Sequence, residues 1–203
     1  MKELDRFIAA EIKADKMEKE LGNKKINYKQ FLYITPRYVV EAIVPFLKEQ
    51  NIKYIWCPAD TIYSEFAKVL KEEGFFIRIS HIQGGWDFLK QKNYKDFPGT
   101  VDFKDGRIYK PDLILTNPPF SLKLEFIKKA NELEIPYMFL LGLPILNYKG
   151  IAEQFEKDQT SLIYLVGSKI SFDGNPSSFQ CSYFTNLIQK NFIILNYNGI
   201  IRE

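Results

Sequence analysis

The chain has 203 residues, of which 46% are hydrophobic and 26% are charged, a composition typical of one ordinary globular domain. Its net charge of +3 is compatible with a nucleic-acid partner but does not by itself point to one. One histidine and two widely separated cysteines, Cys57 and Cys181, argue against a metal site, and both cysteines are interpreted as reduced core residues. No apolar run reaches membrane-spanning length and the N-terminus is charged, so we expect a cytoplasmic protein without a membrane partner.

The first third of the chain predicts two helices. Apolar residues at roughly helical spacing predict a helix over 4–21, and a polar connector follows it. Thr35-Pro36 predicts the start of a second helix, because Thr is a good N-cap and Pro fits the first helical position. We expect Pro45 to kink or limit that helix.

From residue 54 onward, the sequence predicts alternating strands and helices. Residues 84–111 are expected to form loops with a short helix and a short strand. Two further strands, antiparallel, are expected at the C-terminal end. The predicted strands are 54–57, 75–79, 112–116, 137–141, 162–166, 180–187 and 191–197, and the predicted helices are 61–73, 121–133 and 152–155. This order favours an α/β fold with three layers and a mostly parallel sheet, in a single domain over 1–203.

The most informative stretch is Asn117-Pro118-Pro119-Phe120, directly after a predicted strand. The exocyclic amine of adenine is a poor nucleophile, and its two N–H groups need acceptors that draw the nitrogen toward tetrahedral geometry. The side-chain oxygen of Asn117 and the carbonyl of Pro118 can be those acceptors, because the prolines hold a rigid bend. Phe120 offers a face for an extruded base. The tetrad indicates methyl transfer to adenine N6 by positioning and preorganisation; the alternative is a turn that closes a strand.

A second segment is expected at the same edge of the sheet. Ligands of α/β sheets bind outside the carboxyl ends of the strands, near the point where the strand order reverses. The tetrad follows one predicted strand, and Cys57-Pro58-Ala59-Asp60 follows another. Both segments should therefore face one crevice.

Five segments form a collinear set: 31–36 (FLYITP), 56–61 (WCPADT), 85–88 (GWDF), 117–121 (NPPFS) and 183–187 (YFTNL). This set resembles the adenine-specific DNA methyltransferases, most closely their EcoRI-type branch. The resemblance implies a Rossmann-like class I methyltransferase fold, with a seven-stranded, mostly parallel sheet and an antiparallel C-terminal strand. It also implies S-adenosylmethionine (SAM) as methyl donor, an adenine in double-stranded DNA as substrate, and a restriction–modification context.

The resemblance assigns a role to individual residues. The catalytic tetrad would be Asn117, Pro118, Pro119 and Phe120. The residues expected to contact SAM are Tyr33, Thr35, Pro36, Cys57, Pro58, Ala59, Asp60, Thr61, His81, Asp87 and Phe88. Some of these residues have simpler interpretations. Asp87 could be a helix N-cap or a turn acid, and Asp60 could cap the helix expected from Thr61. His81 could be an ordinary polar residue.

The chain departs from the wider methyltransferase pattern in three places. Pro58-Ala59-Asp60 replaces a Gly-rich loop, and the second strand ends in Ser80-His81 rather than in an acid that would hold the ribose hydroxyls. No separate target-recognition domain is expected, so specificity would come from the loops 89–110 and 144–180, from a partner or from a homodimer.

Two alternative functions stay open at this stage. The same fold could methylate RNA adenines or protein glutamines, although glutamine-modifying enzymes favour Tyr where this chain has Phe120. The unusual cofactor loop could instead belong to a catalytically inactive DNA-binding homologue.

Overall fold

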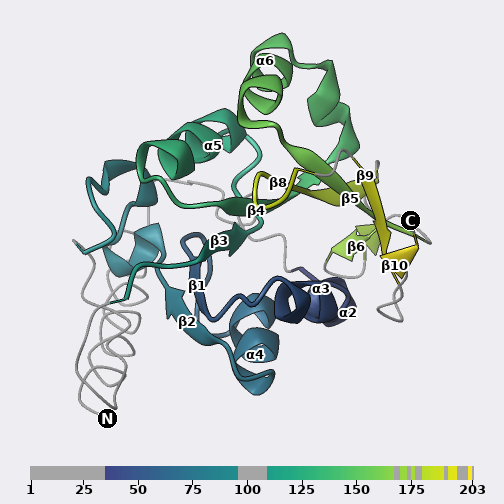
Figure 1. The fold of residues 1–203 in the computed structure, drawn as a ribbon. Helices are drawn as coiled ribbons and strands as arrows, with labels where there is room; N and C mark the ends of the chain where they lie inside the picture. Colours follow the sequence, from purple (N-terminus) through teal and green to yellow (C-terminus); the bar gives the residue numbers. More distant parts are fainter. Residues whose placement is uncertain are drawn as a thin grey trace, which may run out of the picture.

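A computed structural model of the chain describes residues 35–95, 109–166, 170–172, 175–176, 180–189, 192–195 and 201–202. The predicted helix over 4–21 and the site candidate Tyr33 lie outside these residues. In chain order the elements are α2 (Arg37–Glu41), α3 (Val44–Glu49), β1 (Tyr54–Cys57), α4 (Glu65–Glu72), β2 (Phe76–Ile79), η2 (Ile82–Gly84), η3 (Phe88–Lys90), β3 (Leu113–Thr116), α5 (Lys123–Glu132), β4 (Tyr137–Gly142), η4 (Leu143–Asn147), α6 (Lys149–Asp158), β5 (Ser161–Leu165), β6 (Ser171–Phe172), β7 (Asn175–Pro176), β8 (Cys181–Thr185), β9 (Phe192–Leu195) and β10 (Ile201–Arg202) (Figure 1).

Eight of these strands form one sheet, in the order β10-β9-β5-β8-β4-β3-β1-β2. Strands β1 to β5 and β9 run in one direction, and β8 runs the opposite way between β4 and β5. The two-residue β10 adds an antiparallel edge strand. The predicted α/β architecture, a seven-stranded mostly parallel sheet with one antiparallel strand, is therefore confirmed, with β10 as an addition. The arrangement is consistent with a Rossmann-like fold.

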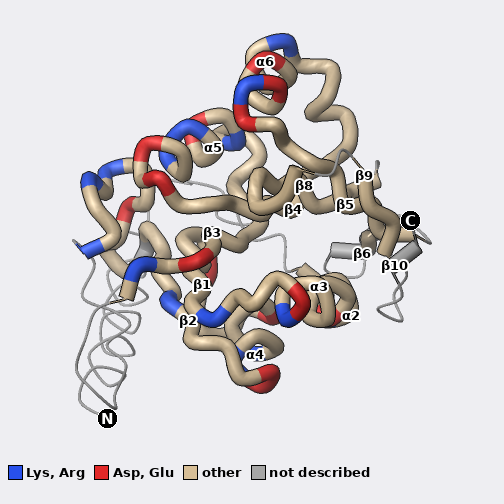
Figure 2. Tube along the Cα trace, viewed as in Figure 1, with Lys and Arg blue, Asp and Glu red and all other residues tan. Residues whose placement is uncertain are grey.

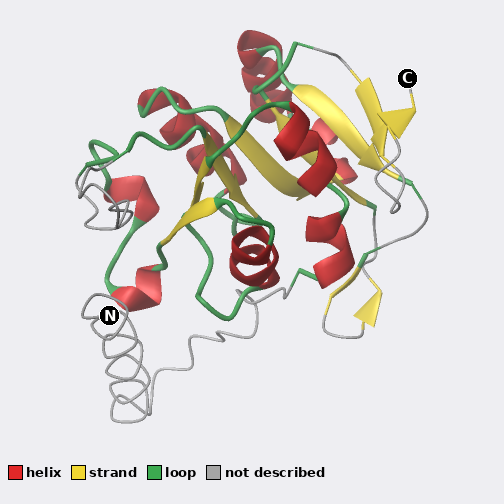
Figure 3. Ribbon diagram, turned by 60° about the horizontal axis from the view of Figure 1, so that its bottom comes forward, coloured by secondary structure: helices red, strands yellow, loops and turns green. Residues whose placement is uncertain are grey.

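Helices cover both faces of the sheet (Figure 1, Figure 3). On one face α2, α3 and α4 pack against strand residues such as Ile55 and Leu115. On the other face α5 and α6 pack against residues such as Trp56 and Phe139. Because both faces are covered, β3 and β4 are buried along their whole length and consist almost entirely of apolar residues. Most charged residues lie on the helices and loops, although β2 carries the buried Arg78, and β4, β5 and β8 carry none (Figure 2).

The first described helix differs from its sequence prediction. It begins at Arg37, and Pro36 is its N-cap in an extended conformation, with no side-chain cap. Thr35 is therefore not the N-cap, contrary to the prediction. The expected interruption by Pro45 is confirmed, because α2 ends at Glu41 and α3 starts anew with Pro45 in its first turn. Pro45 has no N–H to donate to the carbonyl of Glu41.

The start of α4 is a second correction. The helix expected from Thr61 begins only at Glu65, with Ser64 as the N-cap whose hydroxyl accepts a first-turn N–H. Asp60 is consequently not the cap, which leaves its carboxylate for other contacts. The predicted end at Gly74 is confirmed, since this residue has φ +87°, a conformation that glycine adopts without strain.

The C-terminal strands run in opposite directions, as predicted, but they are not neighbours. β5 lies between β8 and β9 and is parallel to β9. The helix predicted over 152–155 is part of the longer α6, whose Ile151 and Phe155 are buried. β6 and β7 pair antiparallel as a separate two-stranded sheet. None of the helices in the described ranges combines the length and apolarity that crossing a membrane requires.

Candidate active site

The strand order reverses between β1 and β3. From β1 the chain first passes to β2 on one side, and it returns to β3 on the other side. Open α/β sheets bind ligands outside the carboxyl ends of the strands at such a point. The paired strands β1 and β3 end at Cys57 and Thr116, so the segments 58–61 and 117–120 leave the sheet at a common edge, as the sequence predicts.

The amide of Asn117 is oriented by Thr35. Its Nδ2 donates a long hydrogen bond of 3.4 Å to Thr35 Oγ1, although the two residues are 82 positions apart. Thr35 is 6% exposed, so this contact lies at the base of the edge. With Nδ2 engaged, Oδ1 points away from Thr35, and no group of the described residues donates to it. Asn117 therefore presents an unused acceptor.

The carbonyls of the two prolines in the tetrad differ in their hydrogen bonds. The carbonyl of Pro119 accepts the N–H of Leu122 at 2.9 Å, which closes the turn into α5. The carbonyl of Pro118 accepts no hydrogen bond from any described residue. The proline rings fix φ and make the bend rigid, and neither proline has an N–H that could donate to this carbonyl. A second unused acceptor thus follows directly after Asn117, and the half-buried Phe120 follows two residues later in the same turn.

Asp60 is a buried carboxylate at the same edge. It is 8% exposed, and its Oδ2 accepts a hydrogen bond of 2.7 Å from Thr116 Oγ1. Burial raises the pKa of Asp60 to about 6, although hydrogen bonds from Thr116 and Ser64 act in the lowering direction. No cationic side chain of the described ranges pairs with this carboxylate. Such a group is a suitable counter-charge for a cationic ligand.

Lys123, the first residue of α5, belongs to this edge and was missed by the sequence analysis. Its Nζ lies 4.6 Å from the centroid of the Phe120 ring, a cation–π contact of about 0.5–1 kcal/mol at exposed sites. Burial lowers the pKa of Lys123, whereas the nearby Cys181 acts to raise it. The three-residue spacing from Phe120 at the start of a predicted helix was the available signal, because such spacing brings side chains together.

The carboxyl end of β2 is neutral. Ser80 is 1% exposed, and its hydroxyl accepts the indole N–H of Trp56 at 2.9 Å. His81 is half-buried, and burial lowers its pKa, so the imidazole is neutral near pH 7. The end of this strand therefore offers no carboxylate to ribose hydroxyls, as its sequence indicates.

Asp87 and Phe88 take no part in the hydrogen bonds that join Thr35 to Asn117 and Thr116 to Asp60. Asp87 is the N-cap of η3, where its Oδ1 accepts the N–H of Leu89 at 3.0 Å. Its simpler interpretation as a cap is thus confirmed. Phe88 is only 2% exposed, because its ring packs edge-on against Trp56 and next to Phe126 in the core. A cofactor contact by either residue stays a prediction.

The remaining residues predicted to contact SAM lie at the end of β1, in the loop that follows it, and at the start of α2. Cys57 is a fully buried free thiol, and burial raises its pKa well above the ordinary range, so it is neutral at physiological pH. Pro58 is buried and Ala59 packs partly against the core on the α5 side. The Thr61 hydroxyl accepts a backbone N–H of its own loop at 3.3 Å. Pro36 stands next to Thr35 at the start of α2.

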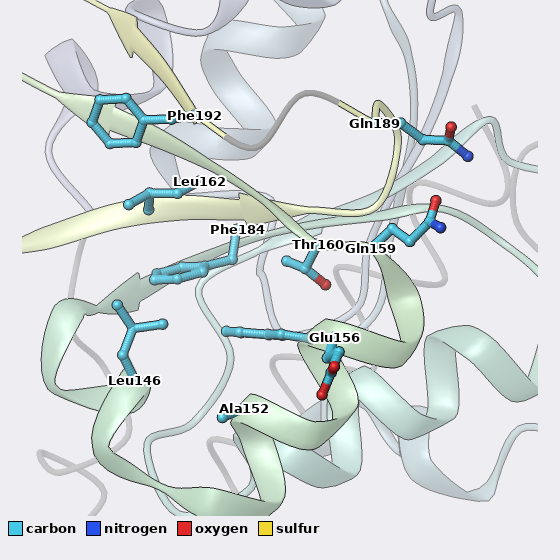
Figure 4. Close-up of a pocket in the computed structure, with 10 residues that line it drawn as sticks. Leu146, Ala152, Glu156, Gln159, Thr160, Leu162, Phe184, Gln189 and Phe192 are labelled. Atoms are coloured by element: carbon cyan, nitrogen blue, oxygen red, sulfur yellow. The ribbon is translucent and has the colours of Figure 1, made fainter.

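A cavity of about 680 Å³ lies elsewhere, between α6 with η4 and the strands β5, β8 and β9 (Figure 4). Leu162, Phe184 and Phe192 line it from the strands, and Glu156 is the one charged residue among the described residues of its lining. None of those lining residues is a predicted site residue. We therefore place the candidate active site at the β1–β3 edge, where polar groups converge, and not at this cavity.

Comparison with known proteins adds no assignment. A scan against protein-family models matches no family, and a search of curated proteins also finds no match. Among the described residues, no group of three or more His, Cys, Asp or Glu side chains could hold a metal ion. The function must therefore be argued from the geometry of the edge.

Proposed function

We propose that the chain is a DNA adenine N6-methyltransferase that uses SAM. The observation that carries the proposal is the pair of unused acceptors after β3, Asn117 Oδ1 and the Pro118 carbonyl, beside the ring of Phe120. An extruded adenine needs two acceptors for its N6 hydrogens and an aromatic face for its ring. The antiparallel β8 in a mostly parallel sheet also supports the class I methyltransferase fold that the resemblance implies.

The residues at the β1–β3 edge fit the methionine end of SAM. Asp60 would be the counter-charge for its ammonium group, because this buried carboxylate has no cationic partner among the described residues. Thr35 and the loop 58–61 would supply the surrounding contacts. When bound there, SAM supplies an electrophilic methyl group on its sulfonium. At the end of β2 no carboxylate is present for the ribose, so the fit is better at the methionine end.

The chain itself would mainly position the nucleophile. Asn117 Oδ1 and the Pro118 carbonyl would each accept one N6 hydrogen, which draws the lone pair out of conjugation with the ring. Thr35 would hold the Asn117 amide in the orientation that this requires. The proton can leave N6 after methyl transfer, so no strong general base is needed. Catalysis would then come from positioning and preorganised electrostatics.

The proposal is tested by methyl transfer from radiolabelled SAM to unmethylated plasmid DNA, followed by digestion to nucleosides. We expect N6-methyladenine as the labelled product. Parallel reactions with RNA and with glutamine-containing protein separate the two alternative substrates. Folded protein that binds SAM but leaves all three substrates unlabelled would refute the proposal.

The inactive homologue is tested separately by calorimetry with SAM. The neutral Ser80-His81 end of β2 is the feature that favours this alternative. A dissociation constant weaker than about 1 mM, which corresponds to about 4 kcal/mol of binding, would support a chain that has lost its cofactor. Micromolar binding would support the enzyme.

A further inference from the structure

Lys123 occupies a position that is unfavourable for a cation. It is the first residue of α5, where the helix dipole disfavours positive charge, and it is half-buried. No carboxylate within the described ranges lies at ion-pair distance, and its one polar-group contact is the face of Phe120. A residue that breaks local rules without a compensating partner is expected at a functional site. Its missing counter-ion points to an anionic ligand.

The location of Lys123 distinguishes between two anions. Asp60 and Thr35, which would hold the cofactor, lie on the β1 side of Asn117. Lys123 lies toward the other side, because its ammonium contacts Phe120, beyond the two prolines, and because it is near Cys181, the first residue of β8, which pairs with Gly142 at the carboxyl end of β4. The target base would stack on Phe120, whose ring the Lys123 ammonium already contacts. The anion that would accompany a base stacked on Phe120 is a phosphate of the substrate backbone, whereas the carboxylate of SAM would lie on the β1 side.

We propose that Lys123 binds a backbone phosphate of the nucleotide whose base stacks on Phe120, which makes the substrate a nucleic acid rather than a protein. This inference rests on the proposed function. In the free protein the ammonium rests over the Phe120 ring, and it moves from the ring to the phosphate when the base enters. Lys123 is in this sense a positioning residue, because it acts on the nucleotide and not on the reacting amine.

The test is the salt dependence of DNA binding by the full chain. A fluorescein-labelled, adenine-rich duplex of mixed sequence is titrated with protein and SAM between about 50 and about 200 mM salt. One lost phosphate contact lowers the slope of log affinity against log salt by about 0.9. For Lys123→Met, which keeps an apolar chain over Phe120, we expect this reduction. Wild-type affinity should then fall about 3.5-fold more than that of the variant across the range.

Matched variants separate a specific contact from a general loss of charge. Lys123→Arg should keep the wild-type slope. Lys128→Met removes an exposed lysine from the same helix and should also keep it. A wild-type slope in Lys123→Met, or an equal reduction in Lys128→Met, overturns the inference.

Two further measurements exclude a structural or cofactor role. Because a half-buried cation is removed, Lys123→Met should melt at the wild-type temperature or slightly above it. Its SAM affinity in calorimetry should be unchanged. A lower melting temperature with an unaltered slope would assign Lys123 to the fold, and a tenfold loss of SAM affinity would assign it to the cofactor carboxylate; either outcome overturns the inference. If methyl transfer is absent while the slope depends on Lys123, the proposed function fails and the phosphate contact stands.

Discussion

In the part of the chain that the structure describes, polar groups at the amino ends of the central strands are hydrogen-bonded to one another, whereas several polar groups at the carboxyl ends are not. At the amino edge of β4, the Tyr137 hydroxyl bonds Thr160 Oγ1 at 2.6 Å and Asp158 at 3.3 Å. The backbone of Tyr137 is satisfied as well, since Asn186 Oδ1 accepts its N–H at 2.8 Å and Thr185 Oγ1 donates to its carbonyl at 2.6 Å. Each of these groups forms a hydrogen bond with another group of the protein, so the amino edge stabilises the fold.

At the carboxyl edge the corresponding groups are left incomplete. Asn117 Oδ1 and the Pro118 carbonyl lack donors, Asp60 lacks a cation and Lys123 lacks an anion, all counted within the described residues. Incomplete polar groups cost stability when they are buried. One edge is completed by groups of the protein itself, and we propose that ligands complete the other. Substitutions at the two edges should therefore have separable effects on stability and on activity.

The largest effect is expected at Asn117. Asn117→Ala removes one of the two acceptors, and by analogy with lost oxyanion donors turnover should fall about 10²–10³-fold. The melting temperature should change little, because Oδ1 stabilises no described group and the hydrogen bond that Nδ2 donates to Thr35 is long, at 3.4 Å. Asn117→Asp keeps an oxygen at this position and should retain more activity than Ala. Initial rates of methyl transfer check this, and full activity of Asn117→Ala would contradict the role.

Asp60 should make stability fall as pH rises. Its pKa is about 6 in the folded protein against an ordinary value of 3.8, so unfolding releases a proton between these values. The free energy of unfolding should therefore drop by about 3 kcal/mol from this residue between about pH 4 and pH 6, and stay low above that. Asp60→Asn should remove this dependence. Urea denaturation of both proteins at several pH values measures the difference, and identical pH profiles would refute the assignment.

Asn186 should show the opposite behaviour, with an effect on stability alone. Asn186→Ala leaves the N–H of the fully buried Tyr137 without its acceptor, which costs about 1–3 kcal/mol. The melting temperature should fall by about 2–4 °C per kcal/mol for a chain of this size. Activity per folded molecule should be unchanged. Asn147→Ala, at an exposed position, serves as the control. A loss of activity in Asn186→Ala but not in Asn147→Ala would contradict the expectation that the amino edge affects stability alone.

The smallest effect is expected at Thr35. Thr35→Val keeps the shape but removes the acceptor that orients the Asn117 amide. Losing one hydrogen bond of about 1 kcal/mol should lower kcat about fivefold. Thr35→Ser should restore most of the rate. A Val variant with wild-type kcat would show that the amide is held by other means.

Most of the described helices and strands could be predicted from the sequence, because they depend on residues that are close together in the chain. Apolar runs identified β1, β3 and β4, because strands buried on both faces need apolar residues throughout. Pro45 and Gly74 marked their helix boundaries through constraints on single backbone positions. The tetrad was visible because its chemistry depends on neighbouring residues.

The tertiary structure alone decided which distant groups meet. A hydrogen bond joins Thr116 to Asp60 because β1 and β3 are adjacent, a consequence of the strand order, and another joins Thr35 to Asn117 because the segment before α2 meets the end of β3. Tertiary packing also placed Phe88 in the core, although its position in the sequence suggested a cofactor contact. Burial and long-range contacts depend on how all the strands pair with one another, and a local sequence pattern does not contain that information.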